Sequence, residues 1–277
     1  MAAQTYYWTD DDGDHSFINP TGNNWKTAAG VAAGAGVFPG SVQADNLLLA
    51  DYAAAAPSVA IDQSGTYAAT TTTSLGILNV TVEDGYAYGL GTKESPFGVE
   101  VAATAVWTFK GNDHGDIWMF GDGTAAVAAV HVLDCSSSGI HLAFGTTICT
   151  LANIMAGTVY LEPSMHGVTS LGVTTLNCAA QPNGSQPTIY IDAPVTTLNN
   201  YGAVIEWRAG TIGTLNNYGG TTRCEKSTTA RTLTASNCYG GTVDFRTGKP
   251  GTITLTGAIA YKGGEILWDI GESLQRS

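Results

Sequence analysis

The chain of 277 residues has 12% charged side chains and a formal net charge of −12, whereas about 25% of residues are charged in an ordinary soluble domain. The acidic excess argues against nucleic-acid binding, which needs a cationic surface, and no apolar run is long enough for a membrane-spanning helix. A hydrophobic content of 44% excludes disorder, and the high share of Gly and Thr favours an all-β chain over a helical bundle.

The N-terminal residues, Met1 to Thr5, have neither the basic segment nor the apolar core of a secretory signal, so we expect synthesis and release in the cytoplasm. Five cysteines, an odd number without metal-site spacing, are predicted to be free and buried, with a disulfide between Cys224 and Cys238 as the alternative. The five histidines are scattered, and the sequence lacks nucleophile-elbow, dinucleotide-binding and phosphate-binding motifs. We therefore expect no catalytic residue, no metal ligand and no cofactor.

Residues 1–60 are predicted to form an N-terminal cap and the first coil of a solenoid. Their pattern is Trp8-x4-Gly13-x3-Phe17, Asn24-Trp25, Pro39-Gly40 and Asp45-Asn46, followed by the apolar residues 47–49. It resembles the opening of autotransporter-type passenger domains and of bacterial and bacteriophage β-solenoid proteins. The resemblance implies a β-solenoid whose cap includes Trp8, Phe17, Trp25, Pro39 and Asp45. In the same region, Asp10, Asp12 and Asp14 have the opening spacing of a calcium loop, but the Gly and the final Glu of such a loop are missing.

Residues 61–270 are predicted to form the coils of the solenoid, and residues 271–277 an exposed tail. Thr197-Leu198-Asn199-Asn200-Tyr201-Gly202 returns 17 residues later as Thr214-Leu215-Asn216-Asn217-Tyr218-Gly219, and weaker copies recur every 17 to 25 residues. Repeats of this length cannot bury an apolar face alone, so stacking into a single-stranded parallel β-helix is expected. An antiparallel sandwich is the alternative, but its strands have no reason to resemble one another.

Asn and Gly in the repeats are predicted to form the corners of the coils, because both accept left-handed backbone conformations. Gly219 and Gly240 are expected to have positive φ angles. The predicted corner residues are Asn199, Asn200, Gly202, Asn216, Asn217, Gly219, Gly220, Gly240, Gly241, Gly263 and Gly264.

Three groups of residues are candidates for chemistry, each with a simpler structural explanation. Asp192, Glu206 and Asp244, with Arg208 and Arg246, would suit a glycan-cleaving site, but repetition along the coils favours surface ladders of opposite charge. The polar segment 111–123 would suit Ca²⁺, although its residues are those that ordinary turns require. The corner tyrosines 201, 218 and 239 would suit sugar stacking, although an aromatic stack at a corner of the coil is favoured.

The sequence therefore predicts a structural, non-enzymatic virion protein of a bacteriophage, either capsid decoration or a tail or fibre component. It would assemble as a homotrimer and contact other virion proteins such as the major capsid protein, without nucleic acid or membrane as partner. The alternative is an extracellular glycan-binding or glycan-cleaving β-helix, an adhesin passenger or a depolymerase, with a host-surface glycan as partner. A protein of that class should have one non-repeating carboxylate cluster in a groove.

Overall fold

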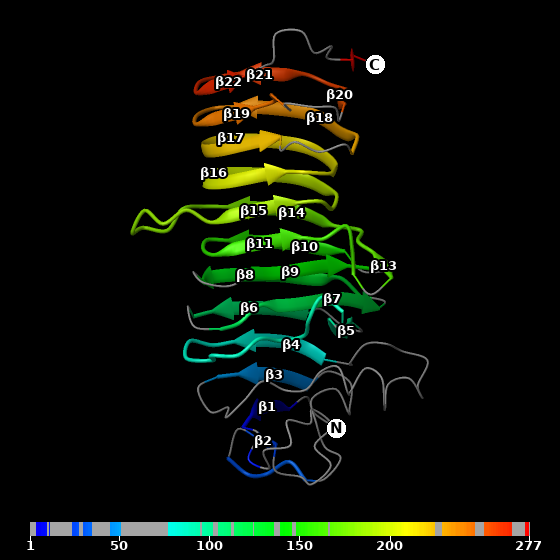
Figure 1. Ribbon diagram of the computed structural model, residues 1–277, viewed down its shortest axis with the longest axis vertical. Helices are drawn as coiled ribbons and strands as arrows, with labels where there is room; N and C mark the ends of the chain where they lie inside the picture. The colour runs from blue at the N-terminus through cyan, green and yellow to red at the C-terminus, as the bar shows by residue number, and fades with distance from the viewer. Residues whose placement is uncertain are drawn as a thin grey trace.

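The computed structural model is a tall stack of coils, with strands of successive coils lying above one another (Figure 1). It describes residues 4–9, 11, 24–27, 30–34, 45–50, 77–94, 96–101, 105–111, 114–123, 125–135, 139–145, 148–165, 167–224, 229–246, 252–267 and 275–276. The described residues form strands, turns and loops without a helix, and nearly all strand pairs are parallel. The fold is the all-β parallel β-helix that the repeats predict.

Each coil contributes one strand to each of two parallel sheets. The first sheet contains β3, β4, β6, β8, β10, β14, the first halves of β16 and β17, β18, β20 and β21. The second contains β5, β7, β9, β11, β15, the second halves of β16 and β17, β19 and β22. Because β16 and β17 run through a corner without a break, they join the two sheets.

The strand bounds follow the short Thr-, Val- and Ile-rich segments of the sequence. In chain order they are β1 (Thr5–Trp8), β2 (Trp25–Thr27), β3 (Asp45–Leu49), β4 (Ile77–Val82), β5 (Phe97–Val101), β6 (Ala105–Lys110), β7 (Ile117–Gly123), β8 (Val127–Asp134), β9 (Gly139–Phe144), β10 (Cys149–Ile154), β11 (Thr158–Leu161), β12 (Ser164–Met165), β13 (Val168–Thr169), β14 (Val173–Cys178), β15 (Thr188–Ile191), β16 (Val195–Trp207), β17 (Gly210–Cys224), β18 (Arg231–Cys238), β19 (Thr242–Asp244), β20 (Ile253–Leu255), β21 (Ile259–Tyr261), β22 (Glu265–Leu267) and β23 (Gln275–Arg276).

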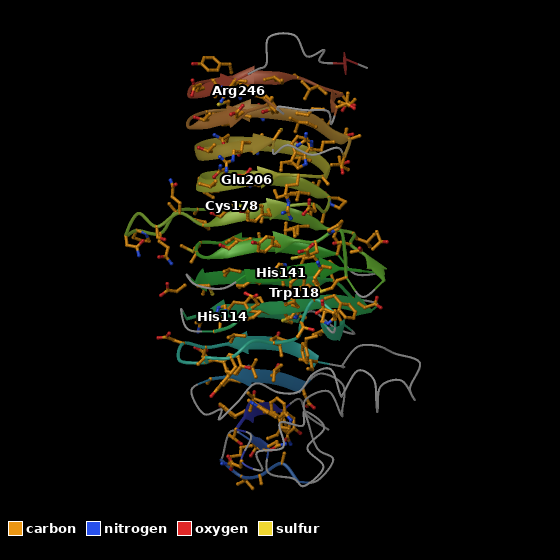
Figure 2. All side chains as sticks on the ribbon, in the orientation of Figure 1. His114, Trp118, His141, Cys178, Glu206 and Arg246 are labelled. Atoms are coloured by element: carbon orange, nitrogen blue, oxygen red, sulfur yellow. The ribbon has the colours of Figure 1, made fainter. Side chains whose placement is uncertain are left out.

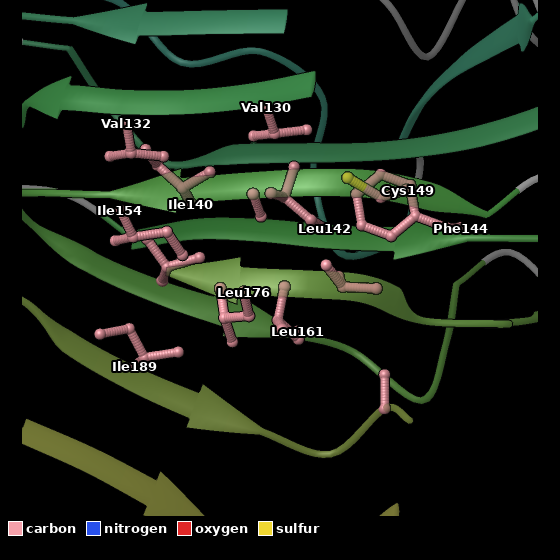
Figure 3. Packing of buried hydrophobic residues seen from close by; sticks show 14 of the residues in the cluster. Val130, Val132, Ile140, Leu142, Phe144, Cys149, Ile154, Leu161, Leu176 and Ile189 are labelled. Carbon is pink, nitrogen blue, oxygen red and sulfur yellow. The ribbon is translucent and has the colours of Figure 1, made fainter. Parts of the chain in front are cut away.

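One hydrophobic core runs along the inside of the solenoid. The strands alternate buried and half-buried residues, as in β6, because successive side chains point to opposite faces. Inward residues at equivalent positions stack from coil to coil, as Ile140, Leu142, Ile154, Leu161, Leu176 and Ile189 show (Figure 3). All five cysteines are free and buried, in agreement with the prediction, and no disulfide joins Cys224 to Cys238.

The paired asparagines of the repeats occupy two different environments. Asn199 and Asn216 lie within the strands and face outward, where each side-chain amide donates to the Asn of the preceding coil at 2.9 Å. Asn200 and Asn217 are fully buried at the corner. The Asn200 Oδ1 accepts hydrogen bonds from the backbone N–H groups of Gly202 and Ala203. Only the second Asn of each pair therefore builds the corner.

The corner glycines also differ from the expectation. The positive φ angles fall one residue after Gly219 and Gly240, at Gly220 (+67°) and Gly241 (+66°), and again at Gly264 (+74°). The reason is that the second Gly of each pair makes the left-handed step of the turn. A Cβ on Gly240 would still lie 2.5 Å from the Tyr218 carbonyl oxygen, so this position needs Gly for close approach to the preceding coil.

The described part of the N-terminal region contains three of the five predicted cap residues. Trp8 and Trp25 are fully buried and meet edge to face, with ring centroids 4.9 Å apart. Buried Asp45 accepts a hydrogen bond from the Gln4 backbone N–H at 3.3 Å. Phe17 and Pro39 lie outside the described residues, as do Asp10, Asp12 and Asp14. The antiparallel pair β1–β2 lies at the N-terminal end of the stack, and β1 continues it by pairing in parallel with β3.

Candidate functional site

A cleft of about 330 Å³ opens on the outer surface of the second sheet. Its lining combines two cationic side chains, a carboxylate, an imidazole, two hydroxyl groups, two aromatic rings and a methionine. The lining residues are Lys93, Trp118, His141, Tyr160, Glu162, Ser164, Met165 and Arg208. Trp118, His141 and Tyr160 come from successive coils, each of which adds one residue to a column on this face, and the other lining residues lie beside this column.

Two insertions into the coil repeat form the walls of the cleft. On one side, the loop between β4 and β5 is bound to β7, since the Leu90 N–H donates to the Asp116 carbonyl and the Trp118 N–H to the Leu90 carbonyl. Gly91 allows this approach: its φ is +69°, and a Cβ there would lie 2.6 Å from the Trp118 carbonyl oxygen. On the other side, the β12–β13 hairpin packs Met165 against Phe120 and Trp118, outside the main core.

The floor of the cleft is part of a stack of aromatic rings. Trp118 on β7, His141 on β9, Tyr160 on β11 and Tyr190 on β15 occupy equivalent positions of successive coils. Their rings are nearly parallel, with centroids 3.5, 4.2 and 4.7 Å apart along the stack. Figure 2 shows Trp118 and His141 side by side on neighbouring strands. Because the rings cover one another's faces, the stack presents mainly ring edges to the cleft.

His141 and Glu162 form a hydrogen-bonded pair within the cleft. The imidazole Nδ1 lies 2.8 Å from the Glu162 Oε1, and both side chains are largely shielded, with 12% and 21% of their surfaces exposed. A carboxylate can only accept, so the Nδ1–H donates, and in the neutral imidazole the Nε2 is then the acceptor. This arrangement holds an imidazole in one orientation and tautomer, as a general base requires.

Arg208 closes the C-terminal end of the cleft. Its guanidinium pairs with the Asp192 carboxylate and lies over the Tyr190 ring, 4.7 Å from the centroid. Burial raises the pKa of the Asp192 carboxyl above its ordinary value, although the ion pair with Arg208 lowers it, and the neighbouring Glu162 raises it further. The carboxyl groups of Glu162 and Asp192 thus lie one coil apart, the first bonded to His141 and the second paired with Arg208.

The other carboxylates considered in the sequence lie further along the same face, outside the cleft. Glu206, Arg223 and Asp244 are register partners on β16, β17 and β19 and continue the column of the aromatic stack. Glu206 is buried and pairs with Arg223, and Asp244 pairs with Arg246 at 2.6 Å. The hydrogen bond from Arg246 lowers the pKa of Asp244. Asp192, Glu206 and Asp244 therefore make separate ion pairs along the solenoid.

The polar segment 111–123 serves local structure where it is described. The Asp116 Oδ1 accepts from the Gly139 backbone N–H of the next coil at 2.9 Å. His114 is buried, with its Nδ1 2.9 Å from the Gly115 carbonyl oxygen, while Asn112 and Asp113 lie outside the described residues. Across the described residues, no three His, Cys, Asp or Glu side chains are grouped to hold a metal ion.

The corner tyrosines form a second aromatic stack at the edge of the solenoid. Tyr201, Tyr218 and Tyr239 lie nearly parallel, with centroids 5.0 and 4.7 Å apart. The Lys262 ammonium lies 4.6 Å from the Tyr239 centroid and covers the exposed end of the stack. The rings stack on one another from coil to coil and Lys262 covers one end, so this stack contributes to coil packing.

Sequence reasoning did not identify the cleft or its His141–Glu162 pair. The signal was present as a column of aromatic residues, but its members are separated by 23, 19 and 30 residues because insertions differ from coil to coil. Without the register of the strands, these residues cannot be aligned.

The chain matches no protein-family model, and it matches neither a curated protein nor a solved structure. Among the described residues, none belongs to a helix with the length and apolar character needed to cross a membrane. The function is therefore inferred from the geometry of the chain itself.

Proposed function

We propose that this chain is a structural, non-enzymatic component of a bacteriophage virion, either capsid decoration or part of a tail or fibre. The observation that carries the proposal is the repetition, on the outside of the solenoid, of rows of side chains that bond or stack with one another from coil to coil. Outward amides bond from coil to coil between Asn153 and Asn237, and tyrosines stack at the corner. Such ladders stiffen a rod and use few charges, which suits a protein that packs against other subunits.

In this proposal the chain assembles as a homotrimer, with the major capsid protein or other virion proteins as neighbours. Sedimentation equilibrium should then give a mass three times the 28.6 kDa of the chain. Immunogold labelling of purified virions should place the protein on the capsid or tail, and the label should persist after density-gradient purification. Recovery of the protein only in the particle-free fractions would refute the assignment.

A glycan-binding or glycan-cleaving protein is the second candidate, and the cleft favours it. The His141–Glu162 pair lies between two insertions at one level of the stack, as a singular site does. In a cleaving enzyme the His141 Nε2 would act as the base, oriented by Glu162. Reducing-end assays on a panel of polysaccharides test this candidate. Cleavage by the wild type that is abolished in His141→Ala would replace the structural proposal by the enzymatic one.

A further inference from the structure

We propose that the cleft between the β4–β5 loop and the β12–β13 hairpin binds an acidic saccharide, whose carboxylate pairs with the Lys93 ammonium. This inference rests on the glycan-binding candidate above and names its ligand class. It is independent of particle assembly, because the cleft occupies one part of one outer face.

Across the coils that the structure describes, the cleft interrupts a repetitive surface. Loops inserted into a rigid scaffold are where binding residues concentrate in proteins. Here Lys93 comes from one insertion, Ser164 and Met165 come from another, and the regular strands supply the floor between them. The ion-pair and amide ladders elsewhere repeat over many coils and need no ligand to explain them.

The polar groups of the lining match those of a sugar. Sugar hydroxyls donate and accept hydrogen bonds, so they need both kinds of partner at close range. The Glu162 carboxylate accepts, the Arg208 guanidinium donates, and the Ser164 hydroxyl does both. The Trp118 edge and Met165 supply apolar surface for the C–H groups of a sugar ring.

The charges of the lining select an acidic ligand. Arg208 is paired with Asp192, so its charge is compensated within the protein, and the Glu162 carboxylate is engaged by its hydrogen bond with His141. Lys93 is exposed at the rim and makes no hydrogen bond or ion pair with the residues that the structure describes. In a chain with 23 acidic and 11 basic residues, an uncompensated cation over a cleft is an attractive site for a carboxylate.

The length of the cleft indicates more than one sugar ring. Its floor crosses three coils, from Trp118 on β7 through His141 on β9 to Tyr160 on β11. At about 4.8 Å between neighbouring strands, these positions span about 10 Å along the solenoid axis. A short oligosaccharide lying across the strands fits this path, with its carboxylate at the Lys93 end.

Calorimetric titration of the full chain with three oligosaccharides of equal length tests the proposal: carboxylated, sulfated and uncharged. The carboxylated oligosaccharide should bind at least tenfold more tightly than the uncharged one, and the sulfated one, which also presents an anion to Lys93, should bind more tightly than the uncharged one as well. The Lys93→Gln variant should lose about tenfold of this affinity, and Lys93→Arg should retain it. Lys262→Gln, which removes a lysine from the corner stack outside the cleft, should bind as the wild type does.

Three results would overturn the inference: no binding of the carboxylated oligosaccharide, equal binding of the uncharged one, or equal losses in Lys93→Gln and Lys262→Gln. Both substitutions are at exposed side chains, and circular dichroism verifies that each variant is folded. Virion association of the Lys93→Gln variant distinguishes this inference from the structural proposal. Retained association with lost binding would separate the two, and lost association with retained binding would contradict the cleft assignment.

Discussion

Replacing Asn200 by Ala should destabilise the fold far more than the same change at its neighbour Asn199. The Asn200 amide is fully buried and accepts from the backbone N–H groups of Gly202 and Ala203 at 3.1 and 2.8 Å. Its Nδ2 also lies 3.0 Å from the Asn217 Oδ1 and 3.1 Å from the Thr222 Oγ1. Truncation leaves two buried N–H groups without acceptors, each at a cost of about 1–3 kcal/mol, so a total loss of about 4 kcal/mol is expected.

Asn199 is the matched control, because it has the same side chain, one position away, on the outer face. Its amide bonds to Asn177 and Asn216 are reachable by water, so Asn199→Ala should cost only about 1 kcal/mol. Guanidinium unfolding followed by tryptophan fluorescence measures both variants. Because repeat arrays can unfold in parts, hydrogen exchange at residues 200–204 provides the local measurement. Equal losses in the two variants, or a loss below about 1 kcal/mol for Asn200→Ala, would refute the assignment of Asn200 as the corner residue.

Three further predictions concern the corners, the ion pairs and the thiols. Gly241→Ala should be strongly destabilising, because the backbone φ there is +66° and the added Cβ would lie 2.3 Å from the Gly220 carbonyl oxygen. Gly184→Ala is the control: its φ is +85° but the space around it is open, so it should cost only about 1 kcal/mol. Similar melting temperatures for the two variants would contradict the close-approach argument. Arg223→Met should cost about 2 kcal/mol of stability, because it leaves the carboxylate of buried Glu206 without its ion-pair partner. Arg246→Met, at the more exposed pair with Asp244, should cost less than about 0.5 kcal/mol. In a denaturant titration, adding Glu206→Gln to Arg223→Met should recover most of the loss, and failure to recover it would exclude the buried charge as the cause. Burial raises the pKa of the Cys135, Cys149 and Cys224 thiols from 9.0 to about 12. The stability gained by keeping these thiols protonated is therefore complete below pH 9 and is lost as the pH rises towards 12. Unfolding midpoints measured from pH 8 to 11 should fall less steeply in Cys149→Ala than in the wild type, and parallel curves would count against the thiol contribution.

The repeated TLNNYG segment allowed the stacking of coils to be predicted from the sequence, because identical residues at equivalent positions of a sandwich would have no cause. The repeat shows which residues of different coils correspond, but not which of two adjacent residues points inward. Asn199 and Asn200 are the same residue type, and only the strand register separates the outer ladder from the buried corner. The positive φ angle was likewise assigned to the first Gly of the pair, when the turn places it at the second.

The cleft was less accessible to sequence reasoning. Lys93, His141, Glu162 and Arg208 belong to four different segments, and coil lengths vary between them. No spacing rule relates these residues, since their proximity depends on where each insertion leaves the solenoid and returns to it. By contrast, the sequence predicts ion pairs for Glu206 and Asp244, because the acid–aromatic–base triplets 206–208 and 244–246 correspond. The partner of Glu206 is nevertheless Arg223 of the next coil.

The outward amide ladder has a direction that the other ladders lack. Every Nδ2 donates towards the preceding coil, from Asn237 to Asn216 and onward to Asn153, whose amide meets the His131 Nδ1 at 3.2 Å. The aligned amide dipoles reinforce one another, as peptide dipoles do along a helix, so positive potential accumulates at the His131 end and negative potential at the Asn237 end. In the next coil the position belongs to Ala260, which stops the row. The amide row is therefore polarised between the coils of His131 and Asn237, and its two ends differ for any neighbour that docks against that side.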